Sequence, residues 1–407
     1  MSTNDPSSAS ARALEGLRVL DVTQVMAGPF CAMQLCDMGA DVIKVEPPCG
    51  DSTRRMSGAR GTDSPSFNAV NRGKRGIVLD LKTPAAQAAF RRLAARADVI
   101  IENFRPGVME GFGLGYAALA ALNARLIYAS ISGYGQTGPD RRKGGFDLVA
   151  QGITGIMSVT GEPGRPPVKA GLPLTDLGAG LFALSAILAA LLFRERTGRG
   201  QHVDTSLLEA GVALSVWEST EYFSTGGTPQ PMGSAHRMSA PYQAIQCADG
   251  YITVAAANDR LFVRLCEVLG HPEWTALDVY RDDTHRVANH ESLARLIESV
   301  MTTRPRADWL ARLDANDIPC GPINGYAEVF DNPQVRARQM ALEVDHPTLG
   351  HLRTLGSPIK MSATPTDPSR RAPLLGEHTR EVLREMGYDE DAIAALSEGA
   401  ASAPRLE

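Results

Sequence analysis

The chain has 407 residues, more than one ordinary hydrophobic core accommodates, so its length predicts two domains. Its 43% hydrophobic and 21% charged residues are typical of a soluble globular protein. A formal net charge of −5 argues against any general attraction to nucleic acid or to an anionic membrane, so a phosphate-bearing ligand requires a local basic cluster.

The N-terminal segment and the cysteines indicate the compartment. Residues 1–13 are polar, contain no apolar signal core and are expected to form a disordered tail. The six cysteines show neither zinc spacing nor a CxxC pair, so we expect free thiols in a reducing compartment and no metal site. The predicted location is the cytoplasm.

The first elements form a β-α-β unit. Residues 17–22 and 41–46 are β-like, residues 30–38 have helical spacing, and an acidic residue ends the second strand. The segment 23–29 reads TQVMAGP where a dinucleotide-binding fold carries G-x-G-x-x-G. The unit therefore predicts a parallel sheet without an NAD site.

Further strands are expected at residues 76–81, 97–101, 126–131 and 200–204, with helices from residue 84 and over 205–223. Because ligands of open parallel sheets bind beyond the carboxyl ends of the strands, the loops at 25–29, 71–75, 103–107 and 132–138 are candidate site segments. Several basic residues near these loops favour an anionic cofactor, although each basic run alone is typical of a solvated surface. They are Arg72, Arg75, Arg105 and the run 141–143, which ends in Lys143.

Thr175 and Asp176 precede the most apolar stretch of the chain, residues 177–193. This pattern predicts a buried helix whose first turn carries Asp176, where a positioned and poorly solvated carboxylate can act as a nucleophile. The alternative interpretation is that either residue only caps the helix. The apolar run falls just short of a membrane span and is interpreted as a core or subunit-interface helix.

The second half of the chain departs from this pattern. Residues 224–233 resemble a linker, residues 242–256 predict a hairpin turned at Asp249-Gly250, and short helices follow to residue 330. This middle part predicts a small α+β domain, after which residues 342–359 are β-like and residues 379–396 helical. The sequence contains no HExxH, G-x-S-x-G or Walker motif.

A set of motifs in a fixed order resembles the class III CoA-transferases, the family of formyl-CoA transferase and of CaiB/BaiF proteins. The resemblance extends from about residue 14 to 396. It implies an interlocked homodimer whose large Rossmann-like domain combines residues 14–223 and 331–407, with the small domain at 224–330. The motifs are LEGLRVLDVTQVMAGP at 14–29, LCDMGADVIKVE at 35–46, VNRGKR at 70–75, ENFRPG at 102–107, SGYGQTGP at 132–139, LTD at 174–176, PYQ at 241–243, DG at 249–250 and LLGEH at 374–378.

The resemblance also implies a reaction and its residues. Asp176 would attack an acyl-CoA thioester and form in turn an acyl-aspartyl anhydride and an aspartyl-CoA thioester, which an acceptor carboxylate resolves. The substrates would be an acyl-CoA, a free carboxylic acid and coenzyme A itself, with no metal. Residues that match the family's coenzyme A contacts are Val25, Ala27, Asn103, Phe104 and Val108. The basic residues near the strand ends, Arg72, Arg75, Arg105 and Lys143, are not part of that match and are added here as candidates for its phosphates.

The chain departs from part of the family. Met26, a candidate substrate contact, stands where members acting on formyl or oxalyl groups carry Gln, and their loop of four consecutive glycines is absent. Residues 233–236 and 241–243 are more similar to members that move coenzyme A between succinyl-CoA and dicarboxylates such as glutarate or malate. His236 and Arg237 would then bind the distal carboxylate, unless both are solvated linker residues.

Four other functions remain open at this stage. An intramolecular CoA-transferring isomerase would use the same Asp176. An α-methylacyl-CoA racemase needs an acid–base pair, and Phe146 occupies the position of the histidine in the racemase Gly-His-Asp motif. An NAD-dependent oxidoreductase lacks its glycine motif here, and a non-catalytic CoA-binding scaffold would not depend on Asp176.

Overall fold

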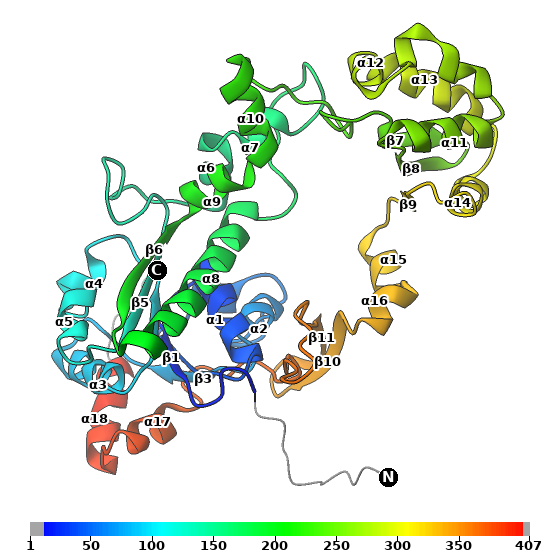
Figure 1. Cartoon of the computed structure of the whole chain (residues 1–407). Coiled ribbons are helices and arrows are strands. Elements are labelled where there is room, and N and C mark those ends of the chain that lie inside the picture. The colour runs from blue at the N-terminus through cyan, green and yellow to red at the C-terminus, as the bar shows by residue number, and fades with distance from the viewer. Residues whose placement is uncertain (1–11, 402–407) are drawn as a thin grey trace, which may run out of the picture. The chain divides into compact units, whose positions relative to one another are not determined.

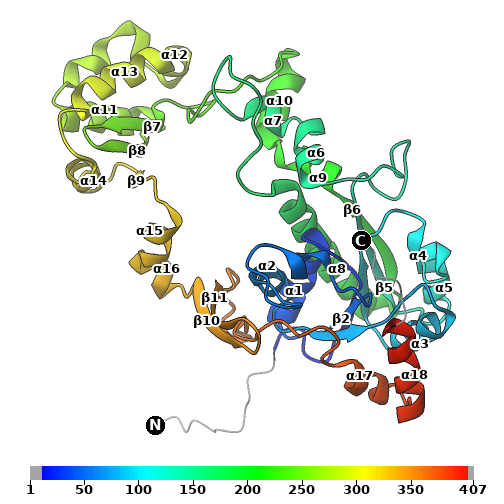
Figure 2. The same cartoon turned by 180° about the vertical axis from the view of Figure 1, so that it is seen from behind.

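The structure, a computed structural model, describes residues 12–401 and the side chains up to residue 396 (Figures 1 and 2). Two compact units divide the chain. Among the described residues, the larger comprises 12–156, 170–216 and 333–401, and the smaller comprises 157–169 and 217–332. Residues 1–11 of the predicted tail lie outside the described residues. The predicted middle domain, 224–330, lies inside the smaller unit, which also includes residues 157–169 and 217–223 of the predicted large domain. Gly233 N donates to the carbonyl of Gly161 at 2.8 Å within this unit.

A six-stranded parallel sheet forms the centre of the larger unit, with the strand order β3-β2-β1-β4-β5-β6. This is the order of doubly wound dinucleotide-binding folds, in which the connections reverse direction between β1 and β4. The prediction of an α/β fold with a parallel sheet is confirmed. The strands are β1 (Arg18–Asp21), β2 (Asp41–Glu46), β3 (Arg75–Val78), β4 (Val99–Glu102), β5 (Ile127–Ser132) and β6 (Gln201–Ser206).

Helices cover both faces of this sheet. Alternate residues of each strand point to opposite faces, so Val19 of β1 joins one core cluster and Leu20 joins the other. The first cluster packs under α1 (Ala27–Asp37), α8 (Leu174–Thr197) and α9 (Leu207–Leu214). The second packs under α3 (Pro84–Ala94), α4 (Val108–Gly111), α5 (Tyr116–Ala120), α17 (Thr379–Glu385) and α18 (Glu390–Ala401).

The C-terminal segment completes the larger unit. Figure 1 shows α17 and α18 in red beside the much earlier α3, and Val382 and Leu383 of α17 are fully buried in the second cluster. Arg75 of β3 bridges Glu381 and Glu385 of α17 at 2.8 and 2.6 Å. Before α17 come α16 (Pro333–Ala337) and an antiparallel hairpin of β10 (Ala341–His346) and β11 (Gly350–Leu355).

Two predicted helices are interrupted. The expected helix over 205–223 breaks at Ser215, between α9 and α10 (Val216–Thr225), because Ser215 leaves helical geometry. The expected helix over 379–396 breaks at Gly387, whose φ of +81° a side chain would disfavour. Short elements that the sequence did not predict are η1 (Ser52–Arg55), α2 (Pro65–Asn71), α6 (Asp147–Ile153) and α7 (Ile156–Val159).

Helix α8 is long and apolar enough to cross a membrane by length and composition alone, a test that core helices of soluble proteins also pass. One side of it is buried against α1, α9 and the sheet through Ala183, Ile187 and Ala190. The interpretation of residues 177–193 as a core helix therefore holds for this side of α8. The opposite side exposes Leu181, Phe182, Leu192 and Phe193.

The smaller unit has its own hydrophobic core and a three-stranded antiparallel sheet. The predicted hairpin forms β7 (Tyr242–Cys247) and β8 (Gly250–Ala255), and the short β9 (Cys320–Pro322) pairs with β8. Helices surround this sheet: α11 (Asp259–Leu269), η2 (Pro272–Ala276), η3 (Asp278–Tyr280), α12 (Asp283–Ala288), α13 (His290–Met301), α14 (Arg306–Asp314) and α15 (Tyr326–Asp331).

Candidate active site

The loops that follow β1 and β4 meet at the point where the sheet connections reverse direction. Gln24 N donates to Asn103 Oδ1, and Asn103 Nδ2 donates back to the carbonyl of Gln24, both at 2.8 Å. These two bonds join the segment 23–27 to the segment 103–107. The structure thus brings Val25, Met26 and Ala27 together with Asn103 and the following Phe104 at the edge of the sheet where ligands of this fold bind.

The start of α1 has two backbone N–H groups, those of Ala27 and Gly28, that find no hydrogen-bond partner in the part of the chain that the structure describes. Met26 occupies the N-cap position, and its side chain makes no capping hydrogen bond. The first N–H groups of a helix have no partner within the helix, and they favour negative charge. The start of α1 can therefore receive a developing oxyanion.

Asp176 reaches this region because α8 packs closely against α1. A Cβ built on Gly180 would lie only 2.7 Å from the carbonyl oxygen of Ala27, so only glycine permits this approach. Asp176 lies four residues before Gly180, which places both on the same side of α8. The first turn of α8 therefore carries Asp176 on the side that faces the start of α1.

The Asp176 carboxylate is half-buried and has no hydrogen bond or ion pair within residues 12–401. Burial, together with the smaller effect of the negative charge of Asp147, raises the pKa of Asp176 to about 6. A carboxylate with this pKa is largely ionised at neutral pH yet poorly solvated. Such a group is a competent nucleophile.

Asp147 caps α8 from a different helix. Its Oδ1 accepts hydrogen bonds from Thr175 N at 3.0 Å and from Thr175 Oγ1 at 2.7 Å, and its Oδ2 accepts one from Gln151 Nε2 at 2.7 Å. Neither Thr175 nor Asp176 caps the helix with its own side chain. The interpretation of Asp176 as a simple cap is therefore wrong, because Asp147 of α6 performs that role.

Two of the basic residues expected at a phosphate are committed to ion pairs. Arg72 is 2% exposed, and its guanidinium binds the Asp37 carboxylate and the backbone oxygen of Leu355. Arg75 pairs with Asp41 at 2.7 Å as well as with α17. Both guanidinium groups therefore hold the larger unit together, and we withdraw them as phosphate ligands.

Arg105 and Lys143 remain accessible. Backbone contact between Gly133 and Gly145 closes the loop 134–144, and a Cβ on Gly133 would lie 2.7 Å from the Cα of Gly145. The closed loop brings Gly144 against the Arg105 guanidinium, whereas Lys143 is exposed and pairs with Asp140 at 2.9 Å. The remaining expected contact, Val108, begins α4 directly after this part of the β4 loop.

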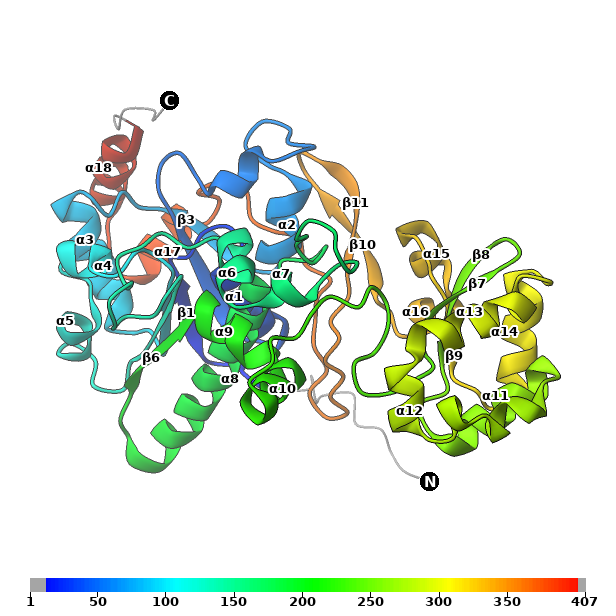
Figure 3. The same ribbon diagram turned by 90° about the horizontal axis from the view of Figure 1, so that it is seen from above.

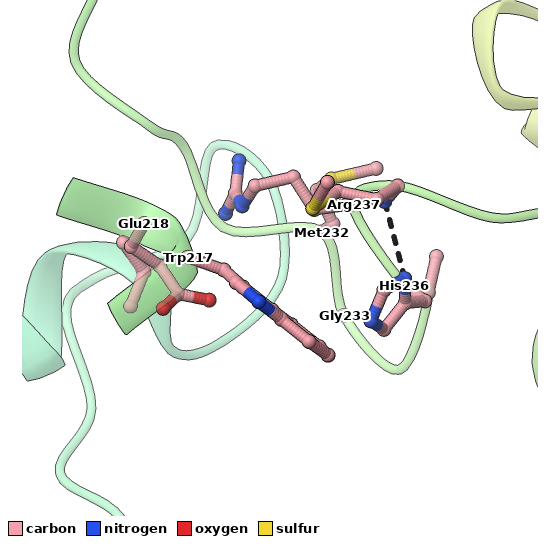
Figure 4. Close-up of a pocket in the computed structure, with 9 residues that line it drawn as sticks. Trp217, Glu218, Met232, Gly233, His236 and Arg237 are labelled. Atoms are coloured by element: carbon pink, nitrogen blue, oxygen red, sulfur yellow. Dashed lines mark hydrogen bonds between the residues drawn. The ribbon is translucent and has the colours of Figure 1, made fainter. Parts of the chain in front are cut away.

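His236 and Arg237 line a cavity of about 130 Å³ within the smaller unit (Figure 4). Arg237 Nη1 pairs with Glu221 at 3.2 Å and Nη2 donates to the carbonyl of Gln230 at 2.9 Å, but Nε is buried without a partner among the described residues. Figure 4 shows Trp217 projecting from α10 towards the loop of Gly233, His236 and Arg237. These two residues are therefore not merely solvated linker residues.

Comparisons with known proteins agree in their result. The family model described as CoA-transferase family III matches residues 14–379. The mouse protein named succinyl-CoA:glutarate CoA-transferase is 39% identical, over 95% of this chain and 89% of that protein. The Haloarcula hispanica protein named succinyl-CoA:mesaconate CoA-transferase is 42% identical, over 92% and 96%. The crystal structure of a CaiB/BaiF family protein from Brucella suis matches with a TM-score of 0.81 and 40% identity, over 92% of this chain and 99% of that one.

The raised pKa of Asp176 predicts that its charge destabilises the fold. The pKa is about 6 in the folded chain against an ordinary value of 3.8, so stability falls as pH rises from about 4 to about 6. Asp176→Asn should therefore stabilise the protein at pH 7.5 by about 1–2 kcal/mol, less than the whole shift implies because the side chain is half-buried.

Denaturant unfolding at pH 7.5 and pH 4 measures this effect. The gain should nearly vanish at pH 4, where the wild-type carboxyl group is protonated in the folded chain. Asp278→Asn, at an exposed position of the smaller unit, should give no gain at either pH. A loss of stability in Asp176→Asn at pH 7.5 would contradict the assignment of a desolvated, unpaired carboxylate.

Proposed function

We propose that Asp176 is the nucleophile of this chain, which belongs to CoA-transferase family III and is a CoA-transferase. The observation that carries this proposal is the half-buried carboxylate of Asp176, which has no bonding partner among the described residues and lies one helical turn before the contact of Gly180 with Ala27. An enzyme that transfers a thiol between two acids needs one group that accepts both the acyl group and the thiol in turn. A carboxylate meets this need because it forms both an anhydride and a thioester.

The proposed reaction has four steps that balance in atoms and charge. The Asp176 carboxylate attacks the thioester carbonyl of the donor, which forms a mixed anhydride and releases the CoA thiolate. The thiolate attacks the Asp176 carbonyl, which frees the first acid as a carboxylate and leaves an aspartyl-CoA thioester. The acceptor carboxylate attacks that thioester and forms a second anhydride and the thiolate. The thiolate then attacks the acceptor carbonyl, which yields the new acyl-CoA and restores Asp176.

Each step passes through a tetrahedral oxyanion that the protein must stabilise. The uncapped N–H groups at the start of α1 support this role, because they belong to the loop beside Asn103. Backbone donors need no rearrangement during the reaction, which is the property that makes such sites effective. Asp147 fixes the first turn of α8 and so holds Asp176 in position for each attack.

The coenzyme is proposed to bind along the carboxyl edge of the sheet. Val25, Ala27, Asn103, Phe104 and Val108 follow β1 and β4 at this edge. Two exposed cations, Arg105 of the β4 loop and Lys143 of the loop after β5, suit its phosphates, and Gly144 beside Lys143 lies against the Arg105 guanidinium.

Succinyl-CoA as donor and a dicarboxylate as acceptor fit the smaller unit. Its cavity is lined by Arg237, whose positive charge suits the distal carboxylate of the acid. The two related proteins are named for glutarate and mesaconate, both dicarboxylates. Racemase chemistry gains no support, because Phe146 holds the position of its histidine at the start of α6 and has no proton to exchange.

A homodimer is the proposed assembly. Helices α6, α8 and α9 pack against one another, as Figure 3 shows, and together they expose many large apolar side chains. Exposed apolar side chains gathered on adjoining helices are typical of an interaction surface, and a second copy of the chain supplies a surface of the same kind. Its members are Phe146, Leu148, Val149 and Ile153 of the α6 region, Leu181, Phe182, Leu192 and Phe193 of α8, and Val212 and Leu214 of α9.

Mass spectrometry tests the nucleophile directly. Protein incubated with succinyl-CoA and then digested should carry the mass of coenzyme A on the peptide that contains Asp176. Hydroxylamine, which cleaves thioesters and anhydrides, should remove this adduct. Asp176→Asn should form no adduct and lose turnover by on the order of a thousandfold or more. An adduct on another peptide, or undiminished turnover, would refute the role of Asp176.

Steady-state kinetics test Arg237. Arg237→Ala should raise the KM for a dicarboxylate acceptor roughly ten- to hundredfold, because a hydrogen bond to a charged group contributes about 1.5–3 kcal/mol. A monocarboxylate of the same chain length should show little change between wild type and variant. Arg281→Ala, an exposed arginine of the same unit, is the matched control and should behave as wild type. An equal KM for the dicarboxylate in both proteins would remove Arg237 from the site.

Sedimentation velocity tests the assembly. The wild-type protein should sediment as twice the chain mass of 43.5 kDa at micromolar concentration. Phe182→Glu should reduce the dimer fraction because it puts a charge into the apolar patch. Leu277→Glu, an equally exposed apolar position of the smaller unit, should leave the dimer intact. A monomeric wild type would disprove the proposed homodimer.

A further inference from the structure

The loop before α1 contains a residue in an unfavourable backbone conformation. Val25 has a φ of +67°, in the left-handed region that a β-branched residue rarely adopts. Such a conformation persists only where the surrounding structure enforces it, and it is concentrated at functional sites. A glycine would adopt this φ without cost, so the valine side chain is retained at the price of strain.

A buried carboxylate holds this strained residue. Asp51 is fully buried, and its two oxygens accept the backbone N–H of Val25 at 3.3 and 3.5 Å. The same carboxylate accepts Thr53 N at 2.9 Å and Thr53 Oγ1 at 2.8 Å. Asp51 therefore links the segment after β2 to the loop after β1.

A buried ammonium group holds the other side of the loop. Lys44 of β2 pairs with Asp51 at 3.2 Å, and its Nζ also donates to the backbone oxygen of Thr23. The side chains of Lys44 and Asp51 both have no exposed surface. Together they bind the carbonyl of Thr23 and the amide of Val25, so both ends of this short segment are fixed.

A second buried pair extends the network to the same loop. Lys74 Nζ pairs with Asp21 at 2.7 Å and donates to the carbonyl of Pro29 at 3.0 Å, while Asp21 accepts Thr23 N at 2.9 Å. Two carboxylates and two ammonium groups thus balance their charges inside the larger unit. Because apolar residues often stabilise a fold as well as a buried ion pair does, stability alone does not account for this network.

We propose that Asp51 and Lys44 are positioning residues that hold residues 23–25 in the conformation that presents Val25 to coenzyme A. This inference rests on the proposed function, since it assumes that coenzyme A binds at the β1 loop. Asp51 acts through the Val25 amide and not on the reacting atoms. The binding edge is therefore preformed before the coenzyme arrives, which lowers the ordering cost of binding.

Substitution of Asp51 by asparagine disturbs only part of these contacts. Asparagine Oδ1 can still accept from Thr53, but its NH2 group at the position of Oδ2 would face two donors, the Val25 amide and the Lys44 ammonium. Val25→Gly removes the need for enforcement, because glycine adopts a positive φ freely. The effect of Asp51→Asn on coenzyme binding should therefore depend on the residue at position 25.

Asp63 offers a matched control. It is a buried aspartate whose Oδ1 accepts from Arg54 at 2.8 Å, and within the described part of the chain it makes no hydrogen bond or ion pair to residues 23–26. Asp63→Asn therefore introduces the same chemical change into another buried ion pair of the same region. A general loss of packing would affect both variants alike.

Calorimetric titration with coenzyme A provides the test. Asp51→Asn should bind coenzyme A at least tenfold more weakly than wild type, whereas Asp63→Asn should bind it within twofold of wild type. In a Val25→Gly background, adding Asp51→Asn should weaken binding less than threefold relative to Val25→Gly alone. Equal weakening by Asp51→Asn and Asp63→Asn, wild-type affinity in Asp51→Asn, or the same loss in both backgrounds would overturn the inference.

Two further measurements complete the test. Hydrogen exchange of residues 22–30 in the wild-type protein should be slow before coenzyme A is added. Rapid exchange that slows only on binding would overturn the inference that the loop is preformed. This measurement needs no variant, so it applies even if a variant fails to fold. A wild-type protein that binds no coenzyme A would refute the proposed function itself. Asp176→Asn that binds coenzyme A normally but does not transfer it separates the chemistry from the positioning.

Discussion

The close approach of α8 to the start of α1 is the constraint on which the site depends. Gly180 permits it, since any side chain there would collide with the carbonyl of Ala27. The same contact aligns two helix starts, one carrying Asp176 and the other carrying free backbone donors. A carboxylate from the middle of the chain thus meets a loop from its first thirty residues, and the doubly wound sheet provides the rigid frame beneath both.

The site resolves a conflict between burial and charge. A nucleophilic carboxylate must be poorly solvated, yet a fully buried one would remain protonated at neutral pH. Asp176 lies between these limits, with a pKa near 6 and part of its side chain accessible. The usual remedy of a capping hydrogen bond would lower its reactivity, and the fold avoids this by assigning the cap to Asp147. The cap thus stabilises the helix without engaging the nucleophile.

The sequence predicted the elements whose signals are local. Short β-like runs identified the strands of the parallel sheet, the least apolar of them at residues 200–204, and the position of Asp176 before an apolar helix identified the nucleophile candidate. The sequence did not reveal interactions between distant segments. Arg72 and Arg75 were predicted to bind phosphates because their ion-pair partners, Asp37 and the residues of α17, lie far from them in the sequence. The sequence analysis considered Phe146 but not the neighbouring Asp147, whose role depends on its contact with Thr175. Buried charges such as Asp51 and Lys44 carry no periodic signal, because their partners are set by the fold.

The return of the C-terminal segment to β3 has a consequence for synthesis on the ribosome. The core under α3 contains side chains from α17 and α18, among them Leu383 and Ile393. That core stays open until almost the whole chain has left the exit tunnel, whereas all segments of the smaller unit emerge earlier. The nascent chain therefore contains all of the smaller unit before the larger unit is complete. The apolar strands of the larger unit that are exposed during this interval are a target for chaperones.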